Sequence, residues 1–182
     1  MPADSHRFLF ALTPPPDIAR RLHALAPDFP DKMLPERLHM TLAITDDFER
    51  VPEGLAPALQ HAGGFVFAEA FELTLDRRRG SHRSIALRPA QAIQGLSELH
   101  RQLAAGMRRA GVPMRRGWSF GPHVTLAYRK GEPFITPTRP ISWQATQFVL
   151  IESLVGRTIH RELGRWPLDA PAPLTLFDEI AA

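Results

Sequence analysis

Residues 37–45 read RLHMTLAIT and residues 122–128 read PHVTLAY, so the chain carries the sequence His-x-Thr-Leu-Ala twice. Polar and apolar residues alternate in both segments, which is typical of β-strands, because residues two apart point to the same face of a strand. The copies begin at His39 and at His123, and each presents its His and its Thr on one face. We therefore predict two related strands, each with one apolar face packed into the core and one small, polar face.

The segments around these two strands alternate between strand patterns and helix patterns. The most regular helix pattern is Ala90–Ala110, in which apolar residues recur at steps of three and four and Gly111 follows as a stop. Shorter helices are predicted from the Pro14–Pro16 run to about Ala26 and at Glu53–His61. Strands are predicted at His6–Leu12, Arg37–Thr45, Phe65–Asp76, His82–Leu87, Pro122–Tyr128, Trp143–Ser153 and Thr158–Trp166, with a turn at Arg77–Ser81.

This order of elements predicts an α+β fold made of two similar halves. No linker separates the halves, so we expect one bilobal domain over residues 1–182, with the Pro-containing tail 169–182 loosely attached. If the halves are related by approximate symmetry, the polar faces of the two motif strands line one cleft between them. That cleft would hold two imidazoles and two threonine hydroxyls.

Such a cleft suits the chemistry of a phosphodiester. An imidazole has an ordinary pKa near ~6.5, so one histidine can accept a proton while the other donates one near neutral pH. Threonine hydroxyls can donate hydrogen bonds to the anionic oxygens, and the small alanines leave room for the group to approach. A single His-x-Thr is usually structural, but two copies with the same Leu-Ala continuation favour catalysis.

The composition excludes several classes of protein. The 182 residues contain no cysteine, which excludes disulfides, thiolate catalysis and thiolate-bound metals. No apolar run approaches the ~20 residues that span a bilayer, and the run at Phe8–Leu12 is too short for a signal peptide, so we expect a cytoplasmic protein. The net charge of +3 is too modest to indicate a long nucleic-acid groove. Two arginine clusters are interpreted mainly as solvated surface: Arg77, Arg78, Arg79 and Arg83, and Arg108, Arg109, Arg115 and Arg116.

The chain resembles the 2H phosphoesterase superfamily, specifically the bacterial RNA 2′,3′-cyclic phosphodiesterases, historically called 2′-5′ RNA ligases. The resemblance rests on the opening FLFALTPPPDIARRLHAL, on ERLHMTLAI and GPHVTLAY, and on the late FVLIES and LGRWPL. It implies a bilobal, pseudo-symmetric α+β fold with two antiparallel sheets flanking a central cleft and helices outside. It also implies hydrolysis of cyclic phosphate without a metal or other cofactor, and reversible ATP-independent 2′-5′ joining of RNA ends.

Carried over residue by residue, the resemblance implies that His39 and His123 are the catalytic pair and that Thr41 and Thr125 bind phosphate. In the family-like assignment, His39 protonates the leaving ribose oxygen and His123 activates water. The sequence leaves open which histidine has which role, because reversal of the reaction exchanges the two.

The sequence departs from the family pattern at three places. Relatives often carry an arginine where Tyr128 stands, and here Arg129 follows it. By strict alternation Arg129 points into the cleft and supplies the phosphate-binding cation, unless a bulge changes the face. Relatives often continue the first motif with an aromatic residue and Leu-Gly-Glu, where this chain has residues 44–47, and His160 replaces a late tyrosine.

Phe120 and Trp118 are candidates for stacking on a base, although packing of their loop is an equally good interpretation. Arg115 and Arg116 are weaker candidates for binding a flanking phosphate. No metal site is predicted, because the two motif histidines have no third ligand at a familiar spacing.

The leading hypothesis is metal-independent hydrolysis of a 2′,3′-cyclic phosphate at an RNA or nucleotide terminus to a 2′-phosphomonoester. We expect the protein to be a monomer and to have no membrane partner. One alternative is a 2H phosphodiesterase acting on another small cyclic or 2′-5′ phosphodiester. The other is a non-catalytic module that binds RNA ends, for which strong salt dependence would be expected.

Overall fold

The fold comes from a computed structural model, which describes residues 5–26, 29, 31–157 and 159–168. The predicted tail 169–182 lies outside these residues. Within the described residues, three helices accompany the strands: α1 (Pro16–Ala24), α2 (Leu55–Gly64) and α3 (Gln94–Arg109), with one 3-10 turn at Pro35–Arg37. The strands are β1 (Ser5–Leu12), β2 (Met40–Ile44), β3 (Phe71–Gly80), β4 (Ser84–Arg88), β5 (Val124–Tyr128), β6 (Phe134–Ala145), β7 (Gln147–Val155) and β8 (Ile159–Pro167).

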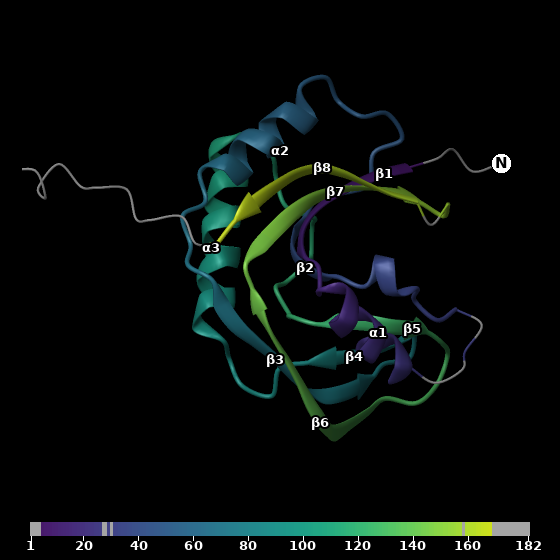
Figure 1. The fold of residues 1–182 in the computed structure, drawn as a ribbon. Helices are drawn as coiled ribbons and strands as arrows, with labels where there is room; N and C mark the ends of the chain where they lie inside the picture. Colours follow the sequence, from purple (N-terminus) through teal and green to yellow (C-terminus); the bar gives the residue numbers. More distant parts are fainter. Residues whose placement is uncertain (1–4, 27–28, 30, 158, 169–182) are drawn as a thin grey trace, which may run out of the picture.

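The strands form one antiparallel sheet in the order β6-β3-β4-β5-β2-β1-β7-β8 (Figure 1). The predicted α+β class is confirmed, and the two expected halves are the first four and the last four strands of this order. The structure corrects one detail of this prediction: instead of two separate sheets, the strands of both halves form one continuous sheet. The motif strands β2 and β5 lie side by side and pair through Met40 and Val124, which joins the halves.

The two halves repeat one connection. In β1–α1–β2 and in β4–α3–β5, two antiparallel neighbours are joined through a helix. Each of these helices packs against a strand of the opposite half, α1 against β6 and α3 against β2. Helix α3 also packs against β3 of its own half, and α2 packs against α3, β7 and β8. Figure 1 shows α2 and α3 together on the outer side of the curved sheet. Helices α2 and α3 therefore cover the outer side of the sheet.

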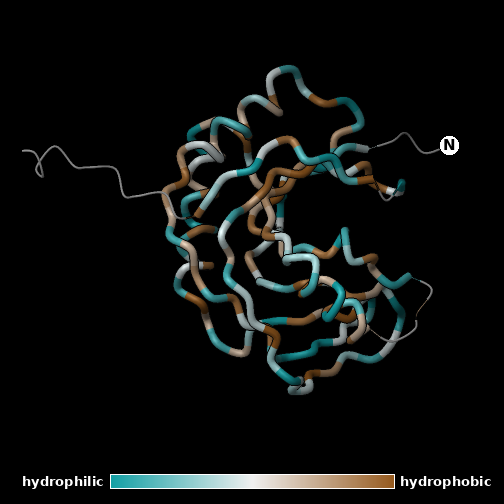
Figure 2. Tube along the Cα trace, viewed as in Figure 1, coloured by the Kyte–Doolittle hydropathy of each residue, from teal (hydrophilic) through white to brown (hydrophobic). Residues whose placement is uncertain are grey.

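The core lies between this outer face of the sheet and the helices. Along α3, Leu96, Leu99, Leu103 and Met107 are buried, as their spacing predicts. Met40 and Val124 are fully buried in the same cluster, so the joint between the halves is part of the core. In Figure 2, hydrophobic and hydrophilic stretches alternate along the outer strands of the sheet, as expected where one face is packed and the other is open.

Several predicted boundaries are wrong; for example, the strand predicted at Phe65–Asp76 begins only at Phe71. The predicted strand Trp143–Ser153 is two strands, because strand structure is interrupted at Thr146: β6 pairs with β3 before this residue, and β7 pairs with β1 after it. Most of β6 lies where no element is predicted, because it contains Pro137 and Pro140. Proline is tolerated there because β6 is an edge strand, in which one side of the backbone needs no hydrogen bonds.

The predicted turn at Arg77–Ser81 is also wrong in most of its length, because β3 continues to Gly80. The arginine run hid the strand, since consecutive charged residues mask the alternation of apolar ones. These arginines therefore have fixed faces on a sheet.

Helices α2 and α3 approach each other at Gly106. A Cβ atom built on Gly106 would lie 2.9 Å from the backbone oxygen of Ala62. Gly106→Ala should therefore destabilise the protein by about 1–3 kcal/mol, although alanine favours a helix by ~1 kcal/mol over glycine. Urea unfolding measures this change. Ser97→Ala, on the exposed face of the same helix, should change stability by less than about 0.5 kcal/mol; a stabilised Gly106→Ala protein would contradict the close approach.

Candidate active site

Each motif histidine lies one residue before its strand and is held in the same way. His39 Nδ1 lies 2.8 Å from the carbonyl oxygen of Arg37, and His123 Nδ1 lies 2.6 Å from that of Gly121. A carbonyl only accepts hydrogen bonds, so Nδ1 carries the proton in both rings. Nε2 is then the atom that gains or loses a proton, and each histidine can act as acid or base through it.

A β-bulge interrupts each motif strand at its leucine. On β1, Phe10 pairs with Ala43 and Ala11 pairs with Thr41, so Leu42 has no partner. A residue inserted in this way shifts the side chains that follow it to the opposite face. Thr41 therefore faces the inner side of the sheet together with Ile44, rather than with Ala43.

The second motif repeats this geometry. On β4, Ile85 pairs with Ala127 and Ala86 pairs with Thr125, which leaves Leu126 without a partner. Thr125 and Tyr128 consequently share the inner face. The extra residue is thus the leucine of the His-x-Thr-Leu-Ala sequence in both copies.

The bulges free two carbonyl groups, and both are satisfied. The Leu42 oxygen lies 2.7 Å from Nδ1 of His100 on α3, and the Leu126 oxygen accepts from the backbone N–H of Met33 at 2.8 Å. Because a buried carbonyl without a partner is costly, these contacts stabilise the bulges. His100 has no repeated motif around it, and its contact with Leu42 is structural.

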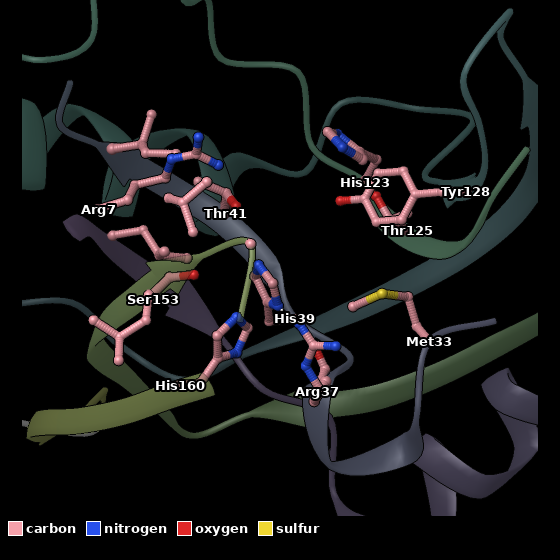
Figure 3. Close-up of a pocket in the computed structure, with 15 residues that line it drawn as sticks. Arg7, Met33, Arg37, His39, Thr41, His123, Thr125, Tyr128, Ser153 and His160 are labelled. Carbon is pink, nitrogen blue, oxygen red and sulfur yellow. Dashed lines mark hydrogen bonds between the residues drawn. The ribbon is translucent and has the colours of Figure 1, made fainter. Parts of the chain in front are cut away.

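The two motifs meet in a cavity of about 270 Å³ between the halves. Figure 3 shows His39, Thr41 and Arg7 on one side, with His123, Thr125 and Tyr128 on the other. All four motif residues therefore line one space, as the sequence predicts. The remaining lining residues are Leu9, Met33, Arg37, Ile44, Ser153, Leu154, Val155, Gly156 and His160.

The two histidines differ in their surroundings. His123 is exposed, whereas His39 is partly buried beside His160, with ring centroids 5.4 Å apart. Burial lowers the pKa of His39, and the positive charges of His123 and Arg37 act in the same direction, while the Arg37 carbonyl opposes them. His39 is therefore mainly neutral near pH 7.

His160 also contributes a neutral ring to the cavity. Burial, with a smaller effect from His39 and Arg37, lowers the pKa of His160 to about 4. At neutral pH it can therefore donate or accept a hydrogen bond without adding charge next to His39.

Two arginines, Arg7 and Arg37, line the cavity, and they differ in whether a carboxylate binds them. Arg7 makes two hydrogen bonds to Asp47, of 2.6 and 2.7 Å, and Arg115 lies 2.8 Å from the same carboxylate. These bonds lower the pKa of Asp47. Arg37 has no carboxylate within ion-pair distance among the described residues, so its charge is available to a ligand. Asp47, which lies in the segment that departs from the family pattern, therefore holds Arg7 and Arg115 in place.

The structure does not place Arg129 in the cavity. Because the bulge at Leu126 changes the face, Tyr128 takes the inward position that strict alternation gives to Arg129. The Arg129 guanidinium lies instead 5.5 Å from the ring centroid of Phe134 and 6.0 Å from that of Phe29.

Phe120 and Trp118 also lie outside this cavity. Phe120 stacks on the His100 ring with centroids 4.1 Å apart and lines a neighbouring hollow. Trp118 packs against the apolar cluster of β1, β2 and β7 that contains Leu9 and Ile44.

Within the ranges that the structure describes, no three His, Asp or Glu side chains gather where they could hold a metal ion. In the same ranges, no helix is both long and apolar enough to cross a membrane.

A family model, that of the 2′-5′ RNA ligase superfamily, matches residues 14–157. The chain belongs to this superfamily. Its fold matches that of the apo form of E. coli LigT with a TM-score of 0.73 and 30% identity, covering 92% of this chain and 99% of that one.

Two further solved structures have the same fold. E. coli LigT complexed with 3′-AMP matches with a TM-score of 0.72 and 28% identity over 92% of this chain and 99% of that one. The protein TT0787 of Thermus thermophilus, at 23% identity, shares the fold with a TM-score of 0.70 over 91% and 100% of the two chains. Among curated proteins, none matches the sequence.

The lowered pKa of His160 predicts a pH-dependent stability. The unfolded chain protonates this ring near its ordinary pKa of ~6.5, but the folded protein does so only at about 4. Between these values the unfolded chain binds more protons, so the free energy of unfolding decreases as the pH falls. His160→Gln should make the loss of stability over this interval smaller by about 1–2 kcal/mol, after allowance for solvent screening.

Urea unfolding across this pH interval measures the difference. His82→Gln, at an exposed histidine, is the control and should keep the wild-type pH dependence. An identical dependence in all three proteins would show that the His160 ring titrates normally.

Proposed function

We propose that this chain hydrolyses a 2′,3′-cyclic phosphate at an RNA or nucleotide terminus to a 2′-phosphomonoester, with no metal required. The observation that carries the proposal is that the imidazoles of His39 and His123 line one cavity. In each ring Nδ1 is held by a backbone carbonyl, and a threonine follows two residues later in the sequence. The LigT complex with 3′-AMP supports a nucleotide as ligand of this fold.

The cavity provides a group for each part of the reaction. The Thr41 and Thr125 hydroxyls donate hydrogen bonds to the two non-bridging oxygens of the cyclic phosphate. A neutral histidine accepts a proton from water as the water oxygen bonds to phosphorus. The protonated histidine donates its proton to the ribose 3′ oxygen as the P–O3′ bond breaks, which leaves the 2′-phosphomonoester.

The lowered pKa of His39 bears on the assignment of these roles. A neutral His39 in the free protein is in the form that accepts a proton, which favours His39 as base and the exposed His123 as acid. This is the reverse of the family-like assignment. If a 5′-hydroxyl replaces water, the same transfers form a 2′-5′ linkage, and no ATP is needed because the cyclic phosphate is already activated.

The central test is turnover of 2′,3′-cyclic mononucleotides in the presence of EDTA. His39→Ala and His123→Ala should each reduce kcat at least about 10²-fold, because each removes one positioned proton transfer. EDTA should leave the wild-type rate unchanged. The control is His82→Ala, at an exposed histidine in the β3–β4 connection, which should retain wild-type turnover.

Full activity of either catalytic variant would contradict the two-histidine mechanism, and loss of activity in EDTA would indicate a metal. Binding of RNA ends without any turnover would support the binding-module alternative instead.

We propose that Arg37, which lines the cavity, supplies the phosphate-binding charge, rather than Arg129, which lies outside it. Arg37→Gln should raise KM for a cyclic mononucleotide about tenfold, because it removes a charge-assisted hydrogen bond to the phosphate. Arg129→Gln should change KM less than about twofold, since that guanidinium lies on Phe134. Steady-state kinetics of both proteins compare the two residues, and the opposite order of effects would restore Arg129 as the phosphate ligand.

A further inference from the structure

The inner face of the sheet that carries Thr125 continues beyond the cavity, across β4 to β3. Paired residues of antiparallel strands place their side chains on the same face. Thr125 pairs with Ala86, and Ala86 pairs in turn with Arg79. Arg79 therefore lies on the same face as Thr125, two strands away.

A second row of residues runs parallel to the first. Arg77 pairs with Arg88, and Arg88 follows Leu87, the partner of Val124. Arg88 therefore lies opposite the position of His123, which precedes Val124. Since neighbouring strands are ~4.8 Å apart, Arg88 is about one strand spacing and Arg77 about two from the motif strand.

Arg88 is tied directly to the second motif. Its Nε donates a hydrogen bond of 3.3 Å to the carbonyl oxygen of Pro122, the residue before His123. The arginine row thus begins at the catalytic segment and is not a separate region of the surface.

These residues surround a hollow of about 320 Å³. Arg77, Arg79 and Arg88 line it together with Phe120 and Ile135, and none of its lining residues is acidic. Arg77 and Arg79 are exposed, and so is Ile135, at 60%. The hollow therefore combines three cations with apolar side chains next to the proposed active site.

Among the residues that the structure describes, the three guanidinium groups have no acidic partner. Within the described part of the chain, none of them forms an ion pair; the nearby Asp76 instead accepts a hydrogen bond from the N–H of Ala90. Burial and the charge of Arg79 lower the pKa of Arg88. Like charges gathered without a counterion repel one another, and a bound anion relieves this repulsion.

We propose that the hollow lined by Arg77, Arg79 and Arg88 binds backbone phosphates of the RNA chain whose cyclic end occupies the cavity. This inference rests on the proposed function and deepens it, because it assigns an RNA chain rather than a mononucleotide as the preferred substrate. Arginine suits this role because its planar fork of donors matches phosphate. Phe120 and Ile135 provide apolar surface for bases, which a free phosphate ion does not need.

The test compares substrates of two lengths. The kcat/KM for a tetranucleotide with a 2′,3′-cyclic end is divided by that for the cyclic mononucleotide. In the wild type this ratio should exceed about tenfold at low salt, and in Arg77→Gln/Arg79→Gln it should fall about tenfold or more. Arg20→Gln/Arg21→Gln is the matched control, because it removes two exposed charges from α1, and it should keep the wild-type ratio.

The salt dependence of binding is measured separately, by fluorescence anisotropy with a labelled tetranucleotide that ends in a 2′-phosphate. Removing two phosphate contacts should reduce the slope of log K against log salt by about 1.4. Arg88 is left in place because its change would disturb the segment before His123.

The outcomes separate this inference from the proposed function. Turnover of the cyclic mononucleotide with an unchanged ratio and slope in Arg77→Gln/Arg79→Gln would overturn the arginine site and leave the proposed function standing. RNA binding that weakens in this variant, without turnover by the wild type, would keep the site and overturn the hydrolase. Equal displacement of the labelled RNA by polyglutamate would overturn RNA as the ligand and indicate an acidic protein.

Discussion

The pairing of β2 with β5 at Met40 and Val124 is the contact on which the rest of the structure depends. It joins two four-stranded halves into one sheet and does so in the core, where both residues are fully buried. Because each partner directly follows a motif histidine, the same contact places His39 and His123 on either side of one cavity. The same strand pairing therefore fixes both the packing of the sheet and the arrangement of the site.

The leucine of each motif has two roles. Leu42 and Leu126 are fully buried, and each is also the extra residue of a bulge. The bulge lets the apolar residues after it remain in the core while Ile44 and Tyr128 return to the cavity. Its cost, a carbonyl released from the ladder, is offset on one side by His100 and on the other by Met33. The two copies thus reach the same geometry with different partners.

The arginines show why local position matters more than net charge. Arg7 is held by Asp47, and Arg129 lies on aromatic rings, although both are close to the motifs in space or in sequence. Arg37 and the row of Arg77, Arg79 and Arg88 keep their charge without an acidic partner among the described residues. A protein with a net charge of only +3 can therefore present a concentrated positive surface on one face.

The sequence by itself determined the α+β class, the amphipathic helix α3 and the grouping of His39, Thr41, His123 and Thr125 around one cavity, because apolar spacing and a repeated motif are local properties. It did not determine the edge strand β6, whose prolines are tolerated only because no further strand pairs beyond it. The sequence also predicted wrongly that Arg129 points into the cavity and that the arginines at the end of β3 form a turn. Only the tertiary structure decided those positions, because a bulge or a strand partner is set by the neighbouring strand, and a shift of one residue reverses the face of every side chain that follows.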